Sequence, residues 1–350
     1  MSALNRDDLR ARVQQALDAF VADHRPALLA MGPELAPLVD AVGELLSGGK
    51  RLRPGFCFWG HLGAGGKDSD DLVTAAASLE MFQAAAIVHD DLMDGSDTRR
   101  GQPAVHRRFA ELHRAEGWQG ASEAFGAGAA ILLGDLCLAW SDEMLVASGL
   151  LNPRAREVFD GMRSELMGGQ YLDLLEQVRG TSNVASALRV ARYKSAKYTI
   201  VEPLHLGAAL ALAPDAVVDV YTAYGMPLGE AFQLRDDVLG VFGDPSVTGK
   251  PAGDDLREGK RTVLVAMALE SATPEQAELV RRHLGDPSLD DAGVAALREL
   301  LVDSGAVDRV EALIEVRTGE ALAALEDAAL DGGAADVLRE LALAATRRAT

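Results

Sequence analysis

Two clusters of acidic side chains, separated by nearly 150 residues, have the composition of a metal site. The first is His89–Asp94 (HDDLMD) and the second is Gln233–Asp237 (QLRDD). Asp90 and Asp94 are four residues apart, so on a helix they share one face, with about 5–6 Å between their Cβ atoms. Two carboxylates at that distance repel each other, and they suit a hard divalent cation such as Mg²⁺, which takes oxygen ligands.

Basic residues accompany both clusters. Arg99 and Arg100 follow the first, and Lys250 and Lys260 follow the second. Upstream, the segment GGKRLRP (48–54) reads as a loop that opens a helix, because proline is well placed in a first helical turn. Its Lys and Arg side chains would lie beside the positive end of that helix, where anions bind. A solvated basic turn is the alternative for this segment alone, and salt bridges to the aspartates are the alternative for the Arg pair.

Carboxylates, Mg²⁺ and Lys or Arg together form a site for a polyanion, and a diphosphate fits best. The composition agrees with a small-molecule site. The net charge of −19 argues against nucleic acid, whose phosphates would be repelled. The two cysteines, Cys57 and Cys137, are too few for a disulfide framework, which indicates a reducing cytoplasm.

The elements that must carry these residues read as helices. Apolar residues recur at helical spacing before each cluster, as in Leu79, Phe82 and Ala86, and strand-like alternation is nearly absent. The N-terminus lacks a signal-peptide core, and the most apolar stretch (124–140) is too short to span a bilayer comfortably. We therefore expect no membrane insertion. The pattern predicts one all-α domain over residues 1–350, with a motif-bearing core at about 25–270 and peripheral helices at 271–350.

Five segments together resemble the trans-isoprenyl diphosphate synthases of the polyprenyl synthetase family, and bacterial geranylgeranyl diphosphate synthases most of all. They occur in the family's order over roughly residues 45–265, and the combination is far more specific than any one of them. The segments are GGKRLRP (48–54), HDDLMDGSDTRRGQPAVH (89–106), GQYLDL (169–174), YKSAKYT (193–199) and FQLRDDVLGVFGDPSVTGKPAGDDLREGKRT (232–262). The resemblance implies a single large helical bundle of the isoprenoid synthase type around a central active-site cavity, and a homodimer.

The resemblance also implies a role for each matching residue. The positions that hold the diphosphate of isopentenyl diphosphate are Lys50, Arg53, Gln83 and Arg100. Those around the allylic diphosphate are Arg99, Lys194, Ser195, Gln233 and Lys250, with Lys260 in support, and Lys194, Ser195 and Gln233 count as catalytic. A cluster of three Mg²⁺ ions, which Mn²⁺ could replace, takes Asp90, Asp94 and Asp236 directly, with Asp91, Asp237 and Asp255 as outer partners. Gln170 and Asp173 form a polar pair facing the reaction chamber.

One position departs from the family pattern. The second acidic motif of the family is often DDxxD, whereas Gly240 occupies the last acidic position in this chain. Glycine cannot bind a metal, so a third carboxylate must come from elsewhere, and Asp244 is a candidate. His89 adjoins the first cluster, but helix geometry turns it away from Asp90 and Asp94, so we expect it to pack.

The implied reaction is the Mg²⁺-dependent, head-to-tail condensation of isopentenyl diphosphate with allylic diphosphates. Product length depends on what lies along the helix before Asp90. Ala85, five residues earlier, leaves room for a prenyl tail, whereas Phe82, eight residues earlier, is the next bulky side chain. We expect Phe82 to be the floor and geranylgeranyl diphosphate the main product; an ordinary core aromatic is the alternative for Phe82. Longer polyprenyl products come second and farnesyl diphosphate third.

Three other classes of protein deserve comparison. A terpene cyclase has no need for a second diphosphate site such as Lys50, Arg53 and Arg100 would form. A di-iron bundle requires two Glu-x-x-His motifs, and the chain has only Glu202-Pro-Leu-His205. A noncatalytic partner subunit of a synthase would not need two intact acidic clusters.

Overall fold

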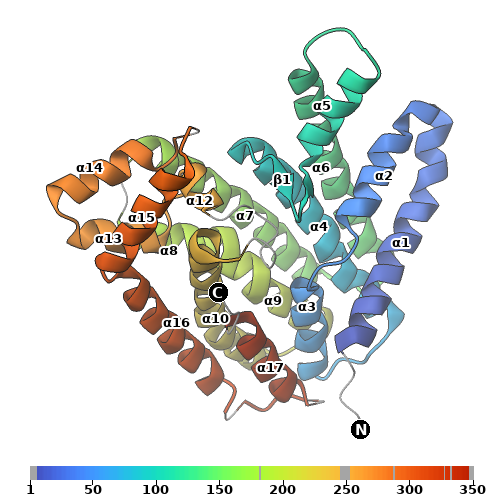
Figure 1. Cartoon of the computed structure of the whole chain (residues 1–350). Coiled ribbons are helices and arrows are strands. Elements are labelled where there is room, and N and C mark those ends of the chain that lie inside the picture. Colours follow the sequence, from blue (N-terminus) through green and yellow to red (C-terminus); the bar gives the residue numbers. More distant parts are fainter. Residues whose placement is uncertain are drawn as a thin grey trace. The chain divides into compact units, whose positions relative to one another are not determined.

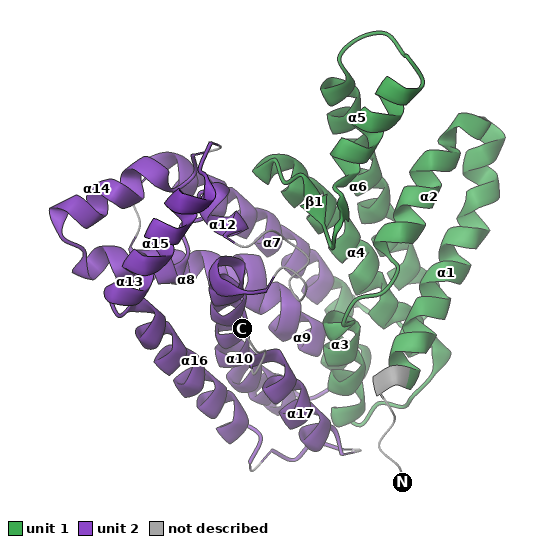
Figure 2. Cartoon of the chain, in the orientation of Figure 1, with its two compact units in different colours: residues 1–156, 206–212 green, residues 157–205, 213–350 purple. Residues whose placement is uncertain are grey.

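The computed structural model describes residues 6–180, 183–244, 253–286, 288–326, 328–331 and 333–346. Helices make up nearly all of this part (Figure 1), so the prediction of an all-α fold is confirmed. The chain divides into two compact units (Figure 2), unit 1 with residues 1–156 and 206–212 and unit 2 with residues 157–205 and 213–350. A single domain around a central cavity stays a prediction.

Unit 1 is built around one long helix that carries the first acidic cluster. The elements of this part of the chain are α1 (Arg6–Met31), η1 (Pro33–Leu35), α2 (Ala36–Leu45), α3 (Leu52–Gly63), α4 (Asp70–Asp94), β1 (Thr98–Arg99), β2 (Gln102–Pro103), α5 (Val105–Ala115) and α6 (Ser122–Ala147). Helix α4 is capped at its N-terminus by Ser69, whose side chain accepts a hydrogen bond from Leu72 N at 3.1 Å. At its C-terminus it is capped by Gly95, whose φ of 69° is a left-handed conformation that glycine adopts without strain.

Helix α4 packs against α6, α1 and α3. Close approach to α6 depends on Gly134, since a Cβ atom there would lie 2.1 Å from Nε2 of His89. The His89 ring also contacts the Ile131 carbonyl oxygen, with Nε2 at 3.2 Å. The prediction that His89 packs is therefore confirmed.

Two helices of unit 1 are long and apolar enough to cross a membrane by length and composition alone. In α4, 72% of the apolar window is buried in the fold, whereas in α6 the figure is 39%. Helix α6 is longer than the apolar stretch at 124–140 and leaves Ile131, Leu132 and Val146 about half exposed or more. The core explains the apolar character of α4, but that of α6 requires another explanation.

Unit 2 is built around α10, which carries the second acidic cluster. The remaining elements of the chain are α7 (Pro153–Arg179), α8 (Val184–Val190), the π-helix η2 (Ala191–Val201), α9 (Glu202–Leu210), α10 (Asp215–Phe242), α12 (Asp254–Arg257), α13 (Val263–Ser271), α14 (Pro274–His283), α15 (Asp291–Asp303), α16 (Ala306–Ala323) and α17 (Ala334–Thr346). All of them lie in unit 2 except the first residues of α7 (153–156) and the second half of α9 (206–210), which belong to unit 1. Helix α10 packs mainly against η2 and α16. Leu234 and Val238 of α10 share a buried core with Val310 and Ile314 of α16.

Two contacts of α10 fix the helix beside its neighbours. A Cβ atom at Gly229 would lie 2.5 Å from Cα of Ala196, so the glycine lets η2 approach at backbone distance. On another side, the Arg235 guanidinium forms a two-pronged ion pair with Glu311 of α16, at 2.5 and 2.6 Å, and donates to the carbonyl oxygen of Thr346 at 3.0 Å. The C-terminal helices therefore support the acidic turn directly.

Candidate active site

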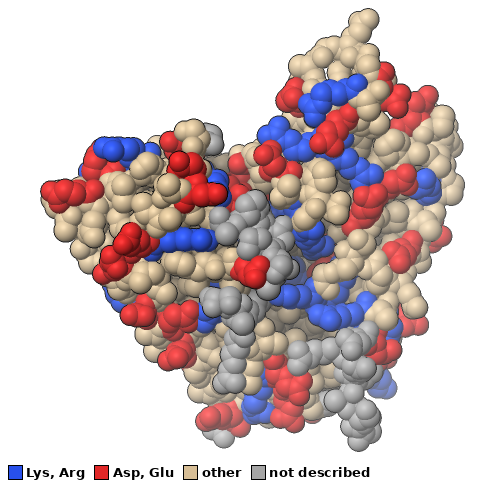
Figure 3. All heavy atoms as spheres, viewed as in Figure 1, with Lys and Arg blue, Asp and Glu red and all other residues tan. Residues whose placement is uncertain are grey.

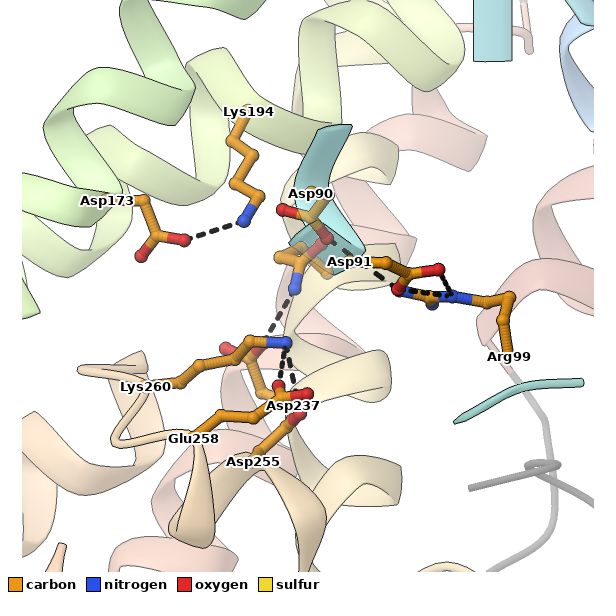
Figure 4. A network of polar contacts seen from close by, with 10 residues as sticks. Asp90, Asp91, Arg99, Asp173, Lys194, Asp237, Asp255, Glu258 and Lys260 are labelled. Atoms are coloured by element: carbon orange, nitrogen blue, oxygen red, sulfur yellow. Dashed lines mark hydrogen bonds and ion pairs between the residues drawn. The ribbon is translucent and has the colours of Figure 1, made fainter. Parts of the chain in front are cut away.

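The first acidic cluster lies in the last two turns of α4. Asp91 is buried and accepts hydrogen bonds from Arg99, with Nε at 2.9 Å from Oδ1 and 3.2 Å from Oδ2. The same guanidinium approaches Asp90, with Nη2 at 3.8 Å from Oδ2. Figure 4 shows Arg99 facing Asp91 from the segment that follows the helix. Arg99 therefore holds the aspartates in the ligand-free protein, as the salt-bridge alternative required.

The hairpin after α4 presents the second arginine of the pair. Strands β1 and β2 are antiparallel, with Thr98 opposite Pro103, and Arg100 occupies the turn with a φ of 53°. Its guanidinium reaches back to the loop before α3, where Nη1 lies 3.4 Å from the Ser47 carbonyl oxygen. A Cβ atom at Gly49 would lie 3.4 Å from the same guanidinium, so this glycine permits the approach.

Positive charge is concentrated at this loop. Partial burial lowers the pKa of Arg100, and the charges of Arg51, Arg99 and Arg53 lower it further, while Glu80 acts in the opposite direction. Guanidinium groups that lie this close repel one another, and a bound anion would reduce that repulsion. This arrangement agrees with the diphosphate site expected from Arg53 and Arg100.

Arg51 has a structural role that sequence reasoning missed. Its side chain is buried, with Nη1 2.6 Å from Oε2 of Glu80 and Nη2 2.5 Å from Oε1 of Gln14. Its two neighbours in the segment differ, since Lys50 is exposed and Arg53 is half-buried. The left-handed φ of 52° at Arg51 turns the chain at this point, and nothing in the local sequence indicates which of the three basic side chains points inward.

Gln83 lies on the same stripe of α4 as the metal-binding candidates. Gln83, Ile87, Asp90 and Asp94 follow one another at intervals of three or four residues, and all four are half-buried. Gln83 therefore lies on the same helix face as Asp90 and Asp94, and its role in binding a diphosphate stays a prediction.

In unit 2, the polar residues of α7 meet those of the π-helix η2. Lys194 Nζ lies 2.6 Å from Oδ2 of Asp173 (Figure 4). Gly169 makes this possible, because a Cβ atom there would lie 2.6 Å from the Lys194 backbone nitrogen. Gln170 and Ser195 are half-buried on the same two elements. π-Helices occur frequently at functional sites, and the one at 191–201 carries both predicted catalytic residues of this segment.

The second acidic cluster contains a deeply buried carboxyl group. Asp237 is 5% exposed, and its Oδ1 accepts a hydrogen bond from Nε2 of Gln233 at 2.7 Å. Burial raises the pKa of Asp237 to about 8; the Gln233 hydrogen bond acts against this shift, and the charges of Asp255 and Asp236 add to it. A cluster in which carboxylates oppose one another's ionisation is one that a cation would stabilise. Asp236 itself is half-buried.

Lys260 forms ion pairs with two carboxylates that lie close to it in the sequence, Asp255 and Glu258. Lys260 Nζ lies 3.3 Å from Oδ1 of Asp255 and 2.7 Å from Oε2 of Glu258 (Figure 4). Sequence reasoning missed Glu258, which lies two residues before Lys260. Lys250 lies outside the described residues.

The residues of the Glu-x-x-His motif are engaged elsewhere. Glu202 forms an ion pair with Lys197, whose Nζ is 3.3 Å from Oε1, and burial raises the pKa of this carboxyl. His205 Nε2 lies 2.9 Å from Oγ1 of Thr222. This geometry argues against the di-iron alternative.

The predicted metal ligands are carboxylates, and their oxygen atoms are the donors that a hard cation such as Mg²⁺ takes. Among the described residues, no group of three or more His, Cys, Asp or Glu side chains forms a ready-made metal site. Mg²⁺ keeps several waters and binds through one or two carboxylates together with substrate phosphates. The assigned direct ligands are divided between the units, with Asp90 and Asp94 in unit 1 and Asp236 in unit 2.

Charged side chains elsewhere are mixed rather than segregated. Figure 3 shows acidic and basic side chains interspersed over the visible face. The excess of negative charge is thus dispersed on this face, which is consistent with a solvated surface.

Comparison with known proteins gives a consistent picture. Residues 36–301 match the family model described as Polyprenyl synthetase. The chain is 34% identical to a geranylfarnesyl diphosphate synthase of Aeropyrum pernix, over 76% of this chain and 79% of that one. It is 33% identical to a geranylgeranyl diphosphate synthase of Mycobacterium tuberculosis, over 81% of this chain and 76% of that one.

A solved structure is similar along its whole length. This is the geranylgeranyl pyrophosphate synthase from Corynebacterium glutamicum, complexed with isoprenyl diphosphate and magnesium. The TM-score is 0.95 at 41% identity, covering 99% of this chain and 100% of that chain.

The buried carboxyl of Asp237 gives a prediction for the metal-free protein. The unfolded chain releases this proton near its ordinary pKa of 3.8 and the folded chain only near 8, so the free energy of unfolding falls as pH rises between these values. Asp237→Asn removes the titration. Thermal melts between about pH 6 and pH 9.5 test this prediction. The melting temperature of the variant minus that of wild type should increase by a few degrees as the pH rises to about 8 and then level off.

Asp219→Asn is the matched control, because Asp219 is an exposed residue of the same helix. Its difference from wild type should not vary with pH. A difference between Asp237→Asn and wild type that is equally independent of pH would contradict the assignment of a raised pKa to Asp237.

Proposed function

The chain belongs to the polyprenyl synthetase family, and we propose that this prenyltransferase joins isopentenyl diphosphate head-to-tail to allylic diphosphates in the presence of Mg²⁺. The observation that carries the proposal is the pairing of site carboxylates with cationic side chains in both units. Asp91 pairs with Arg99, Asp173 with Lys194, and Asp255 with Lys260.

These pairs suggest how the ligand-free site is maintained. Each Lys or Arg neutralises a carboxylate until Mg²⁺ and a diphosphate arrive, and each is then available to the phosphate oxygens. Bidentate arginine suits this exchange, because its planar fork matches carboxylate and phosphate equally. Mg²⁺, when bound, supplies positive charge that stabilises the departing diphosphate.

The proposed reaction needs no nucleophile from the protein. The allylic carbon–oxygen bond breaks, and its electron pair leaves with the diphosphate. The double bond of isopentenyl diphosphate attacks the resulting allylic cation and forms the new carbon–carbon bond. A proton is then lost to the released diphosphate. Arg99, Lys194 and Lys260 stabilise charge on the leaving group in this scheme, and Arg53, Arg100 and the exposed Lys50 hold the second diphosphate.

The finer parts of the proposal follow the family resemblance. We assign three Mg²⁺ ions to the site, replaceable by Mn²⁺, and a cytoplasmic location without membrane insertion. The state of the cysteines supports that location. Cys57 and Cys137 are unpaired and buried, and burial raises the pKa of each thiol to about 12, so neither is a reactive thiolate.

The metal ligands provide the first test of the function. Asp90→Asn should lower turnover of isopentenyl and farnesyl diphosphates by about 10²-fold or more, because charge on the leaving group loses its stabilisation. Chelation of the metal should abolish turnover. The circular dichroism spectrum of the variant should match that of wild type, since Asn is nearly the same size as Asp.

Asp71→Asn is the control for this experiment. Asp71 is exposed in the first turn of the same helix α4, and its substitution should leave turnover unchanged. Wild-type turnover by Asp90→Asn would refute the role assigned to Asp90, and turnover in chelator would refute metal dependence.

Product length gives a second prediction. Phe82 is fully buried two turns before Asp90, as are the small side chains of Ala84 and Ala85 beside it. We propose that Phe82 ends the space for the growing tail and that the main product is geranylgeranyl diphosphate. Three positions along a helix span about 4.5 Å, close to one isoprene unit. Phe82→Leu and Phe82→Ala should shift product chromatography to chains longer than twenty carbons.

The alanine variant removes a buried aromatic ring, which costs about 3–5 kcal/mol of stability, so the leucine variant is the milder test. Met81→Leu is the control, because Met81 is also fully buried but leaves α4 in a direction about 100° away from that of Phe82. An unchanged product distribution in both Phe82 variants would show that Phe82 is only a core aromatic.

Assembly gives a third prediction. Ile131, Leu132 and Val146 are exposed along α6, and a Cβ atom at Gly128 would meet nothing within 4 Å. An exposed apolar stripe of this kind marks an interaction surface, and we propose that a second copy of the chain covers it in a homodimer. Leu132→Glu should convert a dimer into a monomer at micromolar concentration, as measured by light scattering.

Val302→Glu, on the exposed side of α15, is the control for this substitution and should remain dimeric. A monomeric wild-type protein, or a dimer in the Leu132→Glu variant, would contradict the proposed interface.

A further inference from the structure

Position 240 lies where the second acidic cluster lacks a carboxylate. Gly240 follows Asp236 by four residues in α10, so the two share one face of the helix. Asp94 stands in the same relation to Asp90 in α4. On these two helix faces, α4 therefore has two carboxylates one turn apart, whereas α10 has one carboxylate and a glycine.

The space beside Gly240 is filled by a carboxylate from another segment. A Cβ atom at Gly240 would lie 1.8 Å from Oδ2 of Asp255 and 2.5 Å from its Cγ. No real side chain could coexist with Asp255 at that distance. The Asp255 carboxylate thus lies against the helix where a side chain at position 240 would begin.

Resting on the proposed function, we propose that Asp255 supplies the carboxylate that α10 lacks and binds Mg²⁺ directly, and that Gly240 is required to admit it. This changes two expectations from the sequence. Asp255 becomes a direct ligand rather than an outer partner. Asp244, the earlier candidate, is exposed beyond the end of α10.

The backbone around Asp255 is held from both sides. Gly253 has a φ of 78°, and a Cβ atom there would lie 2.6 Å from Cγ1 of Val294 in α15. Leu256 is buried in the same core as Val294, and its carbonyl oxygen accepts a hydrogen bond from Gly285 N at 2.9 Å. Arg257 Nη2 lies 2.9 Å from Oδ1 of Asp291. Tertiary contacts on α15 and the preceding loop therefore fix where Asp255 points.

Lys260 is the counter-ion of this carboxylate in the metal-free protein. Its Nζ lies 3.3 Å from Oδ1 of Asp255, and its backbone nitrogen donates to the Asp255 carbonyl oxygen at 3.0 Å. The side chain reaches a second acceptor in Glu258. Mg²⁺ at Asp255 would thus leave Lys260 a carboxylate partner while its ammonium turns to a diphosphate oxygen.

The test combines substitutions at the two positions and measures Mg²⁺ affinity by calorimetry in the presence of inorganic diphosphate, without turnover. Asp255→Asn should weaken Mg²⁺ binding at least tenfold. Gly240→Ala should weaken it to a similar extent, because the added methyl group displaces the carboxylate. Alanine forms helices better than glycine, so a weaker helix would not explain this loss.

Double variants test whether Asp255 takes the place of a carboxylate at position 240 or whether substitutions there disturb the structure in general. Gly240→Ala should have no further effect in an Asp255→Ala background, where no carboxylate remains to displace. Gly240→Asp in the same background should return Mg²⁺ affinity to within about threefold of wild type, because the helix then provides its own carboxylate. Asp254→Asn, in the same turn as Asp255, is the matched control and should bind Mg²⁺ as wild type does.

The inference is overturned if Asp255→Asn binds Mg²⁺ as wild type does, if Asp244→Asn causes the loss instead, or if Gly240→Asp fails to rescue Asp255→Ala while the variant remains folded by circular dichroism. The proposed function fails separately, if the wild-type protein does not condense isopentenyl and allylic diphosphates.

Discussion

A carboxylate removed from water requires a partner of opposite charge or a proton, and this requirement governs the polar sites of both units. Asp91 at the end of α4 is paired with Arg99, and Asp173 with Lys194. Asp237, which has only the amide of Gln233 as a hydrogen-bond donor in the described contacts, holds its proton up to about pH 8. In the ligand-free protein, two cations and one proton therefore balance these three carboxyl groups. In the proposed function, Mg²⁺ and a diphosphate would replace such counter-charges together.

Close helix packing at glycines places these charges. Gly134 seats the His89 ring on α6, Gly169 admits the backbone of Lys194, and Gly229 brings η2 against α10. A side chain at any of these positions would push apart elements that carry site residues. Gly240 also permits a close approach, but the group that approaches it is the carboxylate of Asp255 rather than a backbone segment. In our proposal, Gly240 is therefore needed for metal binding as well as for packing.

Much of this could be predicted from the sequence, because it depends on local spacing. The placement of Asp90 and Asp94 on one helix face, the packing of His89 and the loop that opens a helix at 48–54 all follow from periodicity and from glycine or proline. Arg51, Glu258 and Asp255 could not be assigned in that way. The inward turn of Arg51 depends on Glu80 on another helix, and the contact of Asp255 in α12 with Gly240 in α10 depends on tertiary structure. The π-helix at 191–201, which packs against α10, also has no signal in the apolar pattern.

The most direct test of the account is the thermodynamic coupling between Mg²⁺ and inorganic diphosphate in the wild-type protein. Calorimetric titration of each ligand, alone and in the presence of the other, measures that coupling. Since Arg99 pairs with Asp91 and Lys260 with Asp255 in the ligand-free protein, we expect each ligand alone to bind weakly. The affinity of the protein for each ligand should increase at least about tenfold when the other ligand is present, after correction for the association of Mg²⁺ with diphosphate in free solution. Equal Mg²⁺ affinity with and without diphosphate would contradict the exchange of partners on which the account rests.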